Sequence, residues 1–448
     1  MTAPYFGWLQ IARLGLIQAC LGAVVVVTTS TLNRIMVVEL AMPALLPGFL
    51  VAWHYAVQIV RPRMGYGADK GRRSTPWMMG GMIVLACGGV MAAIATVWMD
   101  TAPTAGIALS VLSFSLIGLG VSACGTSLLA LMAKQVPDNR RAQAATLVWL
   151  MMIMGFAVTA GVVGKLIDPY TPEILIKVSA GLSLLTVAIT ALCLWGLEKE
   201  GGVSAPQPTK NFANFKEAFR DVSAEPVARN FTIFVFLSML AYSAQDLILE
   251  PFAGAVHGMS PGKTTQLSGW HHMGVLIGML AVAGASTRWV KGRLGSVHAW
   301  MLSGCALSAL ATVGLAMSAL TAPPMAWPLQ ANVVFLGIAN GAFSIAAIAT
   351  MMRLAGQGGP GKEGTRMGLW GAAQAVAFGL GGLVGTGASD LAHAALGDAR
   401  LAYMSVFIFQ ALMFLASALV ASHMRKITTA DKPTNLPNDI LWNKGTTT

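Results

Sequence analysis

Residues 118–134 read GLGVSACGTSLLALMAK, and residues 337–353 read GIANGAFSIAAIATMMR. Both stretches are apolar, begin at a glycine and end sixteen residues later at a cationic residue. Each is close to the ~20 residues that a helix needs to cross a bilayer. Their likeness, at a separation of 219 residues, indicates that one part of the chain repeats another.

The repeat extends outward from these two stretches in both directions. The matching positions keep offsets of 217 to 222 residues; they are Trp53-His54 with Trp270-His271, Trp149 with Trp370, Gly161 with Gly382, Gly164 with Gly385, and Asp168 with Asp390. An ordered series of this kind predicts a six-helix unit that was duplicated in parallel.

The composition places this repeated unit in a membrane. The chain has 448 residues, of which 55% are hydrophobic and 10% charged, and its mean hydropathy is +0.66. Soluble domains carry about 25% charged residues. The 49 glycines suit helices that pack closely in lipid. The five cysteines lie in apolar stretches without metal-ligand spacing, so they are interpreted as small buried hydrophobes.

The predicted fold is an all-α integral membrane protein with twelve transmembrane helices in two pseudo-symmetric six-helix halves. The apolar segments predict helices at 10–32, 44–61, 76–98, 106–132, 143–166, 174–196, 230–249, 266–286, 297–319, 329–352, 367–389 and 401–422. The corresponding domains are an N-terminal half (1–197), a linker (198–229), a C-terminal half (230–424) and a tail (425–448).

The basic residues follow the membrane and do not indicate nucleic acid. With an even number of crossings, 24 of the 29 Lys and Arg residues fall on one side. Cytoplasmic loops are enriched in Lys and Arg. Both termini and the linker are therefore expected in the cytoplasm.

The loop after the second predicted helix, residues 65–73, reads GYGADKGRR. It resembles the cytoplasmic loop signature of the major facilitator superfamily, with one residue missing between Lys70 and Gly71. The resemblance implies a conformational latch, built from Gly65, Asp69, Gly71, Arg72 and Arg73. The alternative is an ordinary basic loop on the cytoplasmic side.

Two further segments resemble a narrower family. They are TLNRIMVVEL (31–40), and Asp246-Leu247 followed by EPFAG (250–254). These segments resemble the PucC/LhaA group of purple phototrophic bacteria, also called bacteriochlorophyll-delivery proteins. The resemblance implies a role in assembling light-harvesting complexes in the bacterial inner, or intracytoplasmic, membrane. The partners it implies are membrane lipid and light-harvesting polypeptides, the reaction-centre complex or bacteriochlorophyll synthase.

Three histidines are candidates for pigment binding. His54 lies within the second predicted helix, and His271 and His272 lie within the eighth. A neutral imidazole nitrogen can act as an axial ligand to the magnesium of bacteriochlorophyll, although magnesium generally prefers oxygen. The alternative is a histidine hydrogen-bonded to a neighbouring helix, because duplication alone can copy a structural Trp-His pair.

Four charged residues are candidates for a gate or an ion pair. Asp246 and Glu250 are four residues apart and share one helix face, at the outer end of the seventh predicted helix. They are interpreted as a cation site, as partners of Arg34, as a proton relay, or as a solvated helix end. Arg34 and Glu39 form either a gate ion pair or part of a solvated loop.

The sequence offers no signal for catalysis. It contains no nucleotide-binding glycine loop between strand and helix, no zinc spacing and no nucleophile elbow. We therefore expect no enzyme activity, no nucleotide and no metal beyond pigment magnesium at His54 or His271. Two functions remain: a factor that binds or delivers bacteriochlorophyll, and a secondary transporter or exporter of a hydrophobic small molecule. The predicted central helices are almost uncharged, which favours a lipid-like ligand.

Overall fold

The computed structural model describes residues 6–58, 73–136, 138–198, 225–285, 296–321, 328–356 and 363–430, and regular structure within these ranges is helical. The first helix is continuous through α1 (Trp8–Val26), η1 (Val27–Thr31), α2 (Leu32–Arg34) and η2 (Ile35–Glu39). The N-terminal half continues with α3 (Leu45–Val57), α5 (Thr75–Thr101), α6 (Pro103–Gln135), α7 (Asp138–Leu166) and α8 (Pro172–Leu194). The C-terminal half holds α10 (Pro226–His257), α11 (Pro261–Ala285), α12 (Val297–Leu320), α13 (Leu329–Gly356), α14 (Glu363–Leu396) and α15 (Ala399–Ala430).

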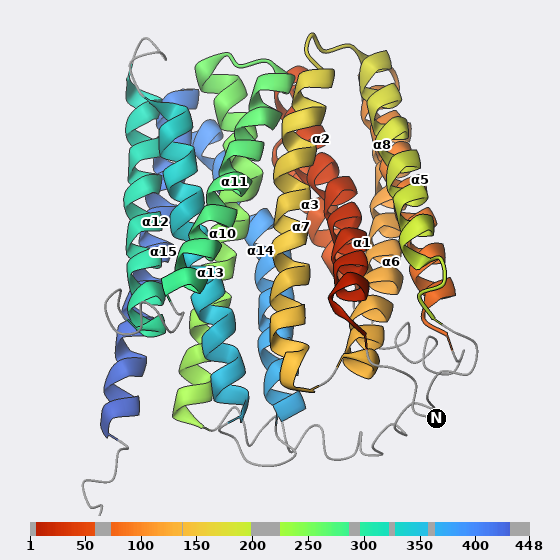
Figure 1. Ribbon diagram of the computed structural model, residues 1–448. Coiled ribbons are helices and arrows are strands. Elements are labelled where there is room, and N and C mark those ends of the chain that lie inside the picture. The colour runs from red at the N-terminus through yellow and green to blue at the C-terminus, as the bar shows by residue number, and fades with distance from the viewer. Residues whose placement is uncertain are drawn as a thin grey trace, which may run out of the picture.

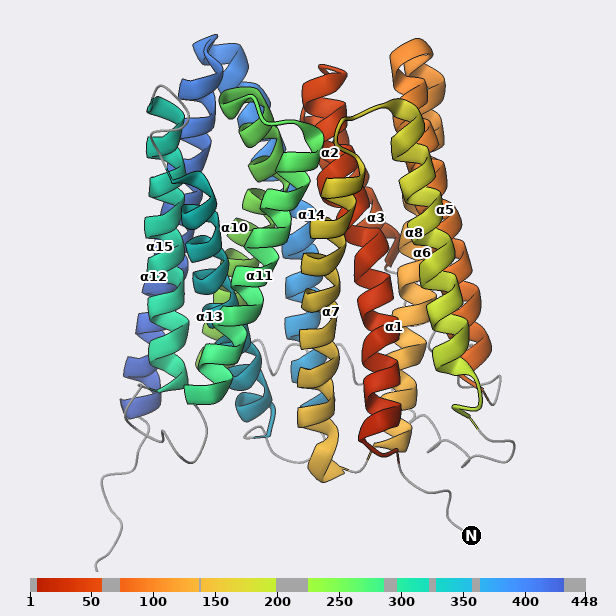
Figure 2. The same ribbon diagram turned by 45° about the horizontal axis from the view of Figure 1, so that its top comes forward.

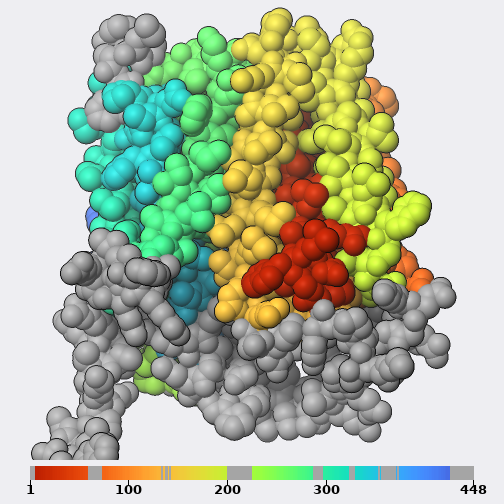
Figure 3. Space-filling model, in the orientation of Figure 1, coloured from red at the N-terminus to blue at the C-terminus, as the bar shows by residue number. Residues whose placement is uncertain are grey.

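The predicted membrane fold is confirmed. Within the described ranges, 11 helices are long and apolar enough to span a membrane, and α3 is a shorter apolar helix. Figures 1 and 2 show α1–α8 as one group and α10–α15 as the other. The two groups meet mainly through α7 with α11 and α3 with α14. On the face shown in Figure 3, α7 lies between α1 and α11.

Several predicted helix ends are wrong: α14 runs to Leu396 and not to 389, and α15 runs to Ala430 and not to 422. Two further errors concern residues singled out above. The first helix runs to Glu39 and not to residue 32, because two π-turns, η1 and η2, carry it past the polar residues Thr28 to Arg34. Helix α10 runs to His257 and not to residue 249, because Pro251 lies inside the helix without ending it. Proline removes one helical hydrogen bond, and tertiary packing can hold the helix together across it.

Close packing of α11 against α13 depends on four glycines. A Cβ built at Gly278 would lie 2.1 Å from the Ile338 carbonyl oxygen, and one at Gly341 would lie 2.1 Å from that of Val275. Gly274 and Gly337 make similar approaches, at 2.4 and 2.2 Å from carbonyl oxygens. Small residues permit such backbone contact between helices in lipid.

The proposed latch loop lies largely outside the described residues. Gly65, Asp69, Gly71 and Arg72 are not described, and Arg73, the last of the set, is exposed. Most of the linker and residues 431–448 also lie outside. The described start of the linker has one clear role: Glu198 accepts hydrogen bonds from the backbone N–H groups of Ser74 and Thr75 at 3.1 and 2.8 Å, at the beginning of α5. A carboxylate there satisfies free N–H groups and suits the positive end of the helix dipole.

We define the terminal end of the bundle as the end where α1 begins and α15 ends, at the bottom of Figure 1, and the far end as the opposite one. The five Lys and Arg residues that break the charge rule all belong to helix portions near the far end; they are Arg34, Lys165, Lys177, Lys263 and Arg400. The other 24 basic residues belong to the segments that the sequence assigns to the opposite side of the membrane. The direction of each described helix therefore agrees with the charge pattern.

A reporter test follows from this topology. Fusions after Lys199 and Lys426 are expected to be active only with a cytoplasmic reporter, because the basic residues concentrate on that side. The measurement compares a cytoplasmic and a periplasmic reporter at each position, with a fusion at Asp398, between α14 and α15, as the control for the opposite side. A periplasmic signal after either lysine would contradict the orientation.

Candidate functional site

The two halves are joined at the far end by a buried arginine. Arg34 is 3% exposed, and its Nη1 donates to Glu39 Oε1 at 2.7 Å. Its Nη2 donates to the carbonyl oxygen of Met259, in the turn between α10 and α11, at 2.8 Å. The structure therefore places Arg34 in an ion pair with Glu39, one of the alternatives that the sequence left open, and not with Asp246 or Glu250. Whether this pair acts as a gate stays a prediction.

Further polar contacts cross from the first helix to the C-terminal half. Asn33 Nδ2 donates to the Leu247 carbonyl oxygen at 2.6 Å, and the Thr31 and Thr265 hydroxyls lie 3.0 Å apart. Thr31, Asn33 and Arg34 all lie in or beside the π-turns of this helix. Such turns recur at functional sites because they redirect side chains.

The repeated aspartates make equivalent contacts across the interface. Asp390, on α14, accepts hydrogen bonds from the backbone N–H groups of Ala44 and Leu45 at the start of α3, at 2.9 and 2.7 Å. Asp168, after α7, accepts from the Ser260 hydroxyl just before α11, at 3.0 Å. Each half thus uses its repeated aspartate to hold the beginning of a helix in the other half.

A row of rings crosses the middle of the interface and contains the candidate histidines. Neighbouring ring centroids lie 4.6 to 6.0 Å apart in the sequence His54, Tyr55, Phe378, Tyr242 and His271. His272 continues the row to Phe156 of α7, at 5.0 Å. His54 is 2% exposed and its Nε2 lies 2.8 Å from Gln58 Nε2. The structure therefore brings His271 and His272 together and places His54 at the other end of the row.

Asp246 joins the two adjacent histidines in a cluster. One ligand atom from each of Asp246, His271 and His272 lies within 4.8 Å of the others. His272 Nδ1 lies 2.8 Å from the Ser268 carbonyl oxygen, and His271 Nε2 lies 3.3 Å from the Asn340 amide nitrogen. Such a set of two imidazoles and one carboxylate can bind a metal ion or exchange protons.

Glu250 lies one turn from Asp246 and is fully buried, which corrects the expectation of a position at the outer end of its helix. Its Oε2 accepts a hydrogen bond from the Thr265 hydroxyl at 3.3 Å, and its Oε1 has no hydrogen-bond partner. The expectation failed because the predicted helix stopped at residue 249, whereas α10 continues through Pro251 to His257.

Sequence reasoning missed the amides that support the cluster. Asn340 Nδ2 lies 2.9 Å from Gln245 Oε1, and Asn340 Oδ1 accepts from the Ser308 hydroxyl at 2.7 Å. All three side chains are fully buried. The available signal was an amide in an otherwise apolar segment, since polar side chains within transmembrane helices seek partners.

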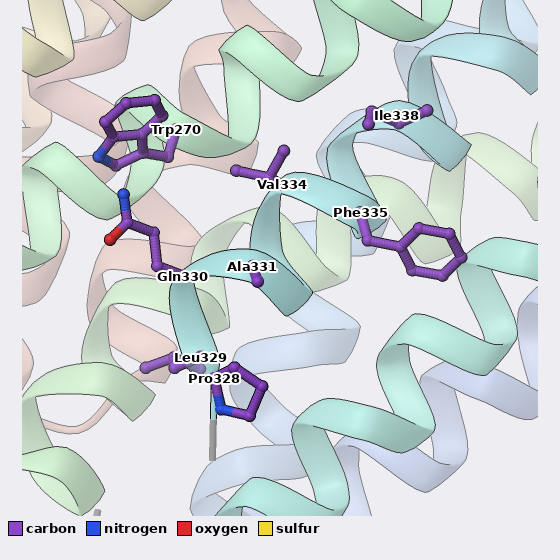
Figure 4. Close-up of a pocket in the computed structure, with 8 residues that line it drawn as sticks. All are labelled: Trp270, Pro328, Leu329, Gln330, Ala331, Val334, Phe335 and Ile338. Atoms are coloured by element: carbon purple, nitrogen blue, oxygen red, sulfur yellow. The ribbon is translucent and has the colours of Figure 1, made fainter. Parts of the chain in front are cut away.

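An apolar groove opens on the outer surface between α11 and α13. It has a volume of about 630 Å³ and is lined by Trp270, Pro328, Leu329, Gln330, Ala331, Val334, Phe335 and Ile338. Figure 4 shows the Gln330 side chain extending toward the Trp270 ring. Trp270 is half exposed, and its neighbour His271 faces the interior of the protein. The groove thus presents one amide among apolar and aromatic side chains.

One protein family matches nearly the whole chain. The model of the family described as PUCC protein matches residues 31–428. The chain belongs to the PucC family. It is 51% identical over 416 residues to the "Bacteriochlorophyll synthase 44.5 kDa chain" of Rhodobacter capsulatus, covering 93% of this chain and 95% of that protein. It is 29% identical to "Protein PucC" of the same species, covering 93% and 92% of the two chains.

Solved structures with the same fold are transporters of the major facilitator type. A bacterial homologue of the human lysosomal transporter Spinster, in an inward-facing and occupied conformation, has a TM-score of 0.67 and 13% identity, covering 97% of this chain and all of that one. A mutant form of the nucleoside transporter NupG has a TM-score of 0.67 and 16% identity, covering 93% and 99%. At this identity the likeness shows the fold of this PucC-family protein and not its substrate.

Proposed function

We propose that this protein is a non-enzymatic membrane factor of photosynthetic complex biogenesis, which binds bacteriochlorophyll and delivers it to light-harvesting polypeptides, to the reaction-centre complex or to the synthase. Membership of the PucC family and the name of the 51% identical relative support this class of function. The observation that carries the proposal is the apolar groove between α11 and α13.

The groove suits part of a pigment that arrives from the lipid. Its volume of about 630 Å³ lies within the ~300–1,000 Å³ of small-molecule sites. The exposed Gln330 offers an amide oxygen, and magnesium prefers oxygen ligands. Trp270 offers an exposed aromatic face beside it. We infer that Gln330 is the first axial ligand to the pigment magnesium.

The histidines remain proposed pigment ligands, but they differ from Gln330 in being buried. His54, His271 and His272 are 2%, 0% and 3% exposed, so a macrocycle reaches their rings only after the helices around them separate. Pigment ligation by a histidine therefore belongs to a more open conformation than the one described, whereas ligation by Gln330 does not.

Absorption of the purified protein tests the proposal. The full chain, isolated in mild detergent from a bacteriochlorophyll-producing host, is expected to carry a bacteriochlorin band in proportion to protein. Gln330→Leu and Trp270→Leu are expected to lower the pigment-to-protein ratio severalfold, since each removes a contact from the groove. Trp53→Leu is the matched control, because Trp53 is the repeat partner of Trp270 and lies outside the groove.

The same measurement distinguishes Gln330 from the histidines as the pigment ligand, and pigment binding from export of a small molecule. Loss of pigment in His54→Leu or His271→Leu, with partial retention in the asparagine variants and normal membrane abundance, would assign the ligand to that histidine and not to Gln330. The alternative function, export of a hydrophobic small molecule, draws support from the fold of the solved transporters. A wild-type protein without any bacteriochlorin band would contradict pigment binding and favour that alternative.

A further inference from the structure

The Asp246, His271 and His272 cluster has the chemistry of a metal site, and it stands apart from the groove. Its ligand atoms come from α10 and α11 and lie within 4.8 Å of one another. A first-row metal binds imidazole nitrogen and carboxylate oxygen at about 2.0–2.2 Å, which allows ligand separations of up to about 4 Å. Binding one ion therefore requires the ligand atoms that lie farthest apart to approach one another by about 1 Å.

A hydrogen bond already orients the His272 imidazole for such an ion, and His271 needs a change of amide orientation beside it. The His272 ring has Nδ1 2.8 Å from the Ser268 carbonyl oxygen, so its Nδ1 carries the proton and Nε2 keeps a free lone pair. Histidine ligands of metals characteristically donate their other N–H to a backbone carbonyl or a similar acceptor. His271 is fully buried and has Asn340 at Nε2, while its Nδ1 has no hydrogen-bond partner. For His271 to ligate through Nδ1, its proton must sit on Nε2, which requires the Asn340 and Gln245 amides to turn together. Asn340 Oδ1 then accepts from His271 Nε2 and from Gln245 Nε2, and Asn340 Nδ2 donates to the Ser308 hydroxyl.

Charge gives an independent reason for a cation here. Asp246 is half-buried and Glu250 fully buried, four residues apart on α10. Within the described ranges, neither forms an ion pair with a lysine or arginine, and Arg34 pairs with Glu39. One buried and one half-buried carboxylate without a lysine or arginine partner are costly in a membrane. One divalent ion at the cluster would balance both charges, and Glu250 Oε1, which has no hydrogen-bond partner, is available one turn away.

We propose that Asp246, His271 and His272 bind a first-row divalent transition metal that ties α10 to α11. The donor set of two nitrogens and one oxygen suits Zn²⁺ or Fe²⁺ better than Mg²⁺ or Ca²⁺. The two helices are joined in the chain by the far-end turn at 258–260, and the cluster lies roughly 15 Å along the helices from that turn. A bound metal would fix the hairpin at mid-depth, where His272 also contacts Phe156 of the other half.

This inference does not depend on the pigment role, and the experiment keeps the two separate. The full chain is produced in a bacterium that makes no bacteriochlorophyll, purified in mild detergent, incubated with Zn²⁺ and dialysed against metal-free buffer. Retained zinc is then measured by mass spectrometry. About one zinc per chain is expected in the wild type, and Asp246→Asn and His272→Gln are expected to weaken zinc binding at least tenfold.

His393→Gln is the matched control. His393 is also a helical histidine, with Nδ1 2.7 Å from the carbonyl oxygen four residues earlier, but it lies on α14 outside the cluster. This variant is expected to retain zinc like the wild type. Wild-type protein that retains no zinc, or an Asp246→Asn variant that retains as much as the wild type, would overturn the proposal.

A second measurement tests the proposal even if the cluster variants fail to fold, because it needs only the wild type and the control variant. Zn²⁺ is expected to raise the thermal unfolding midpoint of the wild type and of His393→Gln, whereas Mg²⁺ at the same concentration is not, because an ion that binds the native state stabilises it. An unchanged midpoint of the wild type with Zn²⁺ would overturn the proposal without any cluster variant.

Discussion

Replacing Gly278 with leucine is expected to destabilise the C-terminal half by about 3 kcal/mol or more, whereas replacing Gly284 with leucine on the same helix is expected to leave its stability unchanged or slightly higher. A Cβ at Gly278 would lie 2.1 Å from the Ile338 carbonyl oxygen, and the obstructing atom is backbone that no rotamer change can move. Overpacking of a well-packed interior costs about 1–3 kcal/mol and occasionally more. Here α11 and α13 would have to separate along a contact that four glycines share. The loss of stability is therefore expected at the upper end of that range.

Gly284 provides the control because a Cβ there meets nothing within 4 Å. At this exposed position leucine also gains about 0.8 kcal/mol of helix propensity over glycine. The measurement is the yield of monodisperse protein in detergent, followed by the thermal unfolding midpoint. Equal yields and midpoints for the two variants would show that α11 and α13 do not pack through these glycines.

Replacing Glu39 with glutamine is expected to lower the free energy of unfolding by about 2 kcal/mol. Removing one partner of a buried ion pair costs about 3–5 kcal/mol, because the other charge stays buried. Arg34 is 3% exposed, but Glu39 is 36% exposed, so water replaces part of the lost interaction. The remaining contact of Arg34, with the Met259 carbonyl oxygen, does not neutralise its charge.

The double variant Arg34→Leu/Glu39→Leu distinguishes a charge effect from a packing effect. It removes both charges, so it is expected to be more stable than Glu39→Gln alone, despite the lost bond to Met259. Glu173→Gln is the control, since Glu173 forms an exposed pair with Lys177 on α8 and should show no measurable change. Unfolding is followed in a denaturant titration. A double variant less stable than Glu39→Gln would contradict the argument.

Fold and candidate site differ in how much of each could be predicted. The twelve apolar segments, the two-fold repeat and the side of the basic residues follow from local composition, and the described helices agree with them. The repeat also placed Trp53-His54 and Trp270-His271 in equivalent helices, α3 and α11. The sequence showed Asp168 and Asp390 only as matching positions of the repeat. The structure shows that each makes a hydrogen bond across the interface to the beginning of a helix in the other half.

The sequence alone determined that this is a two-half helical membrane protein of the PucC kind, because segment length, hydropathy and motif are properties of neighbouring residues. The tertiary structure alone decided which helix faces meet. In a soluble helix the polar face marks the outside, but lipid and protein interior are both apolar, so hydropathy does not separate the faces of a membrane helix. For that reason the burial of Arg34 and Glu250, the meeting of Asp246 with His271 and His272, and the groove at Gln330 depend on packing between segments far apart in the chain.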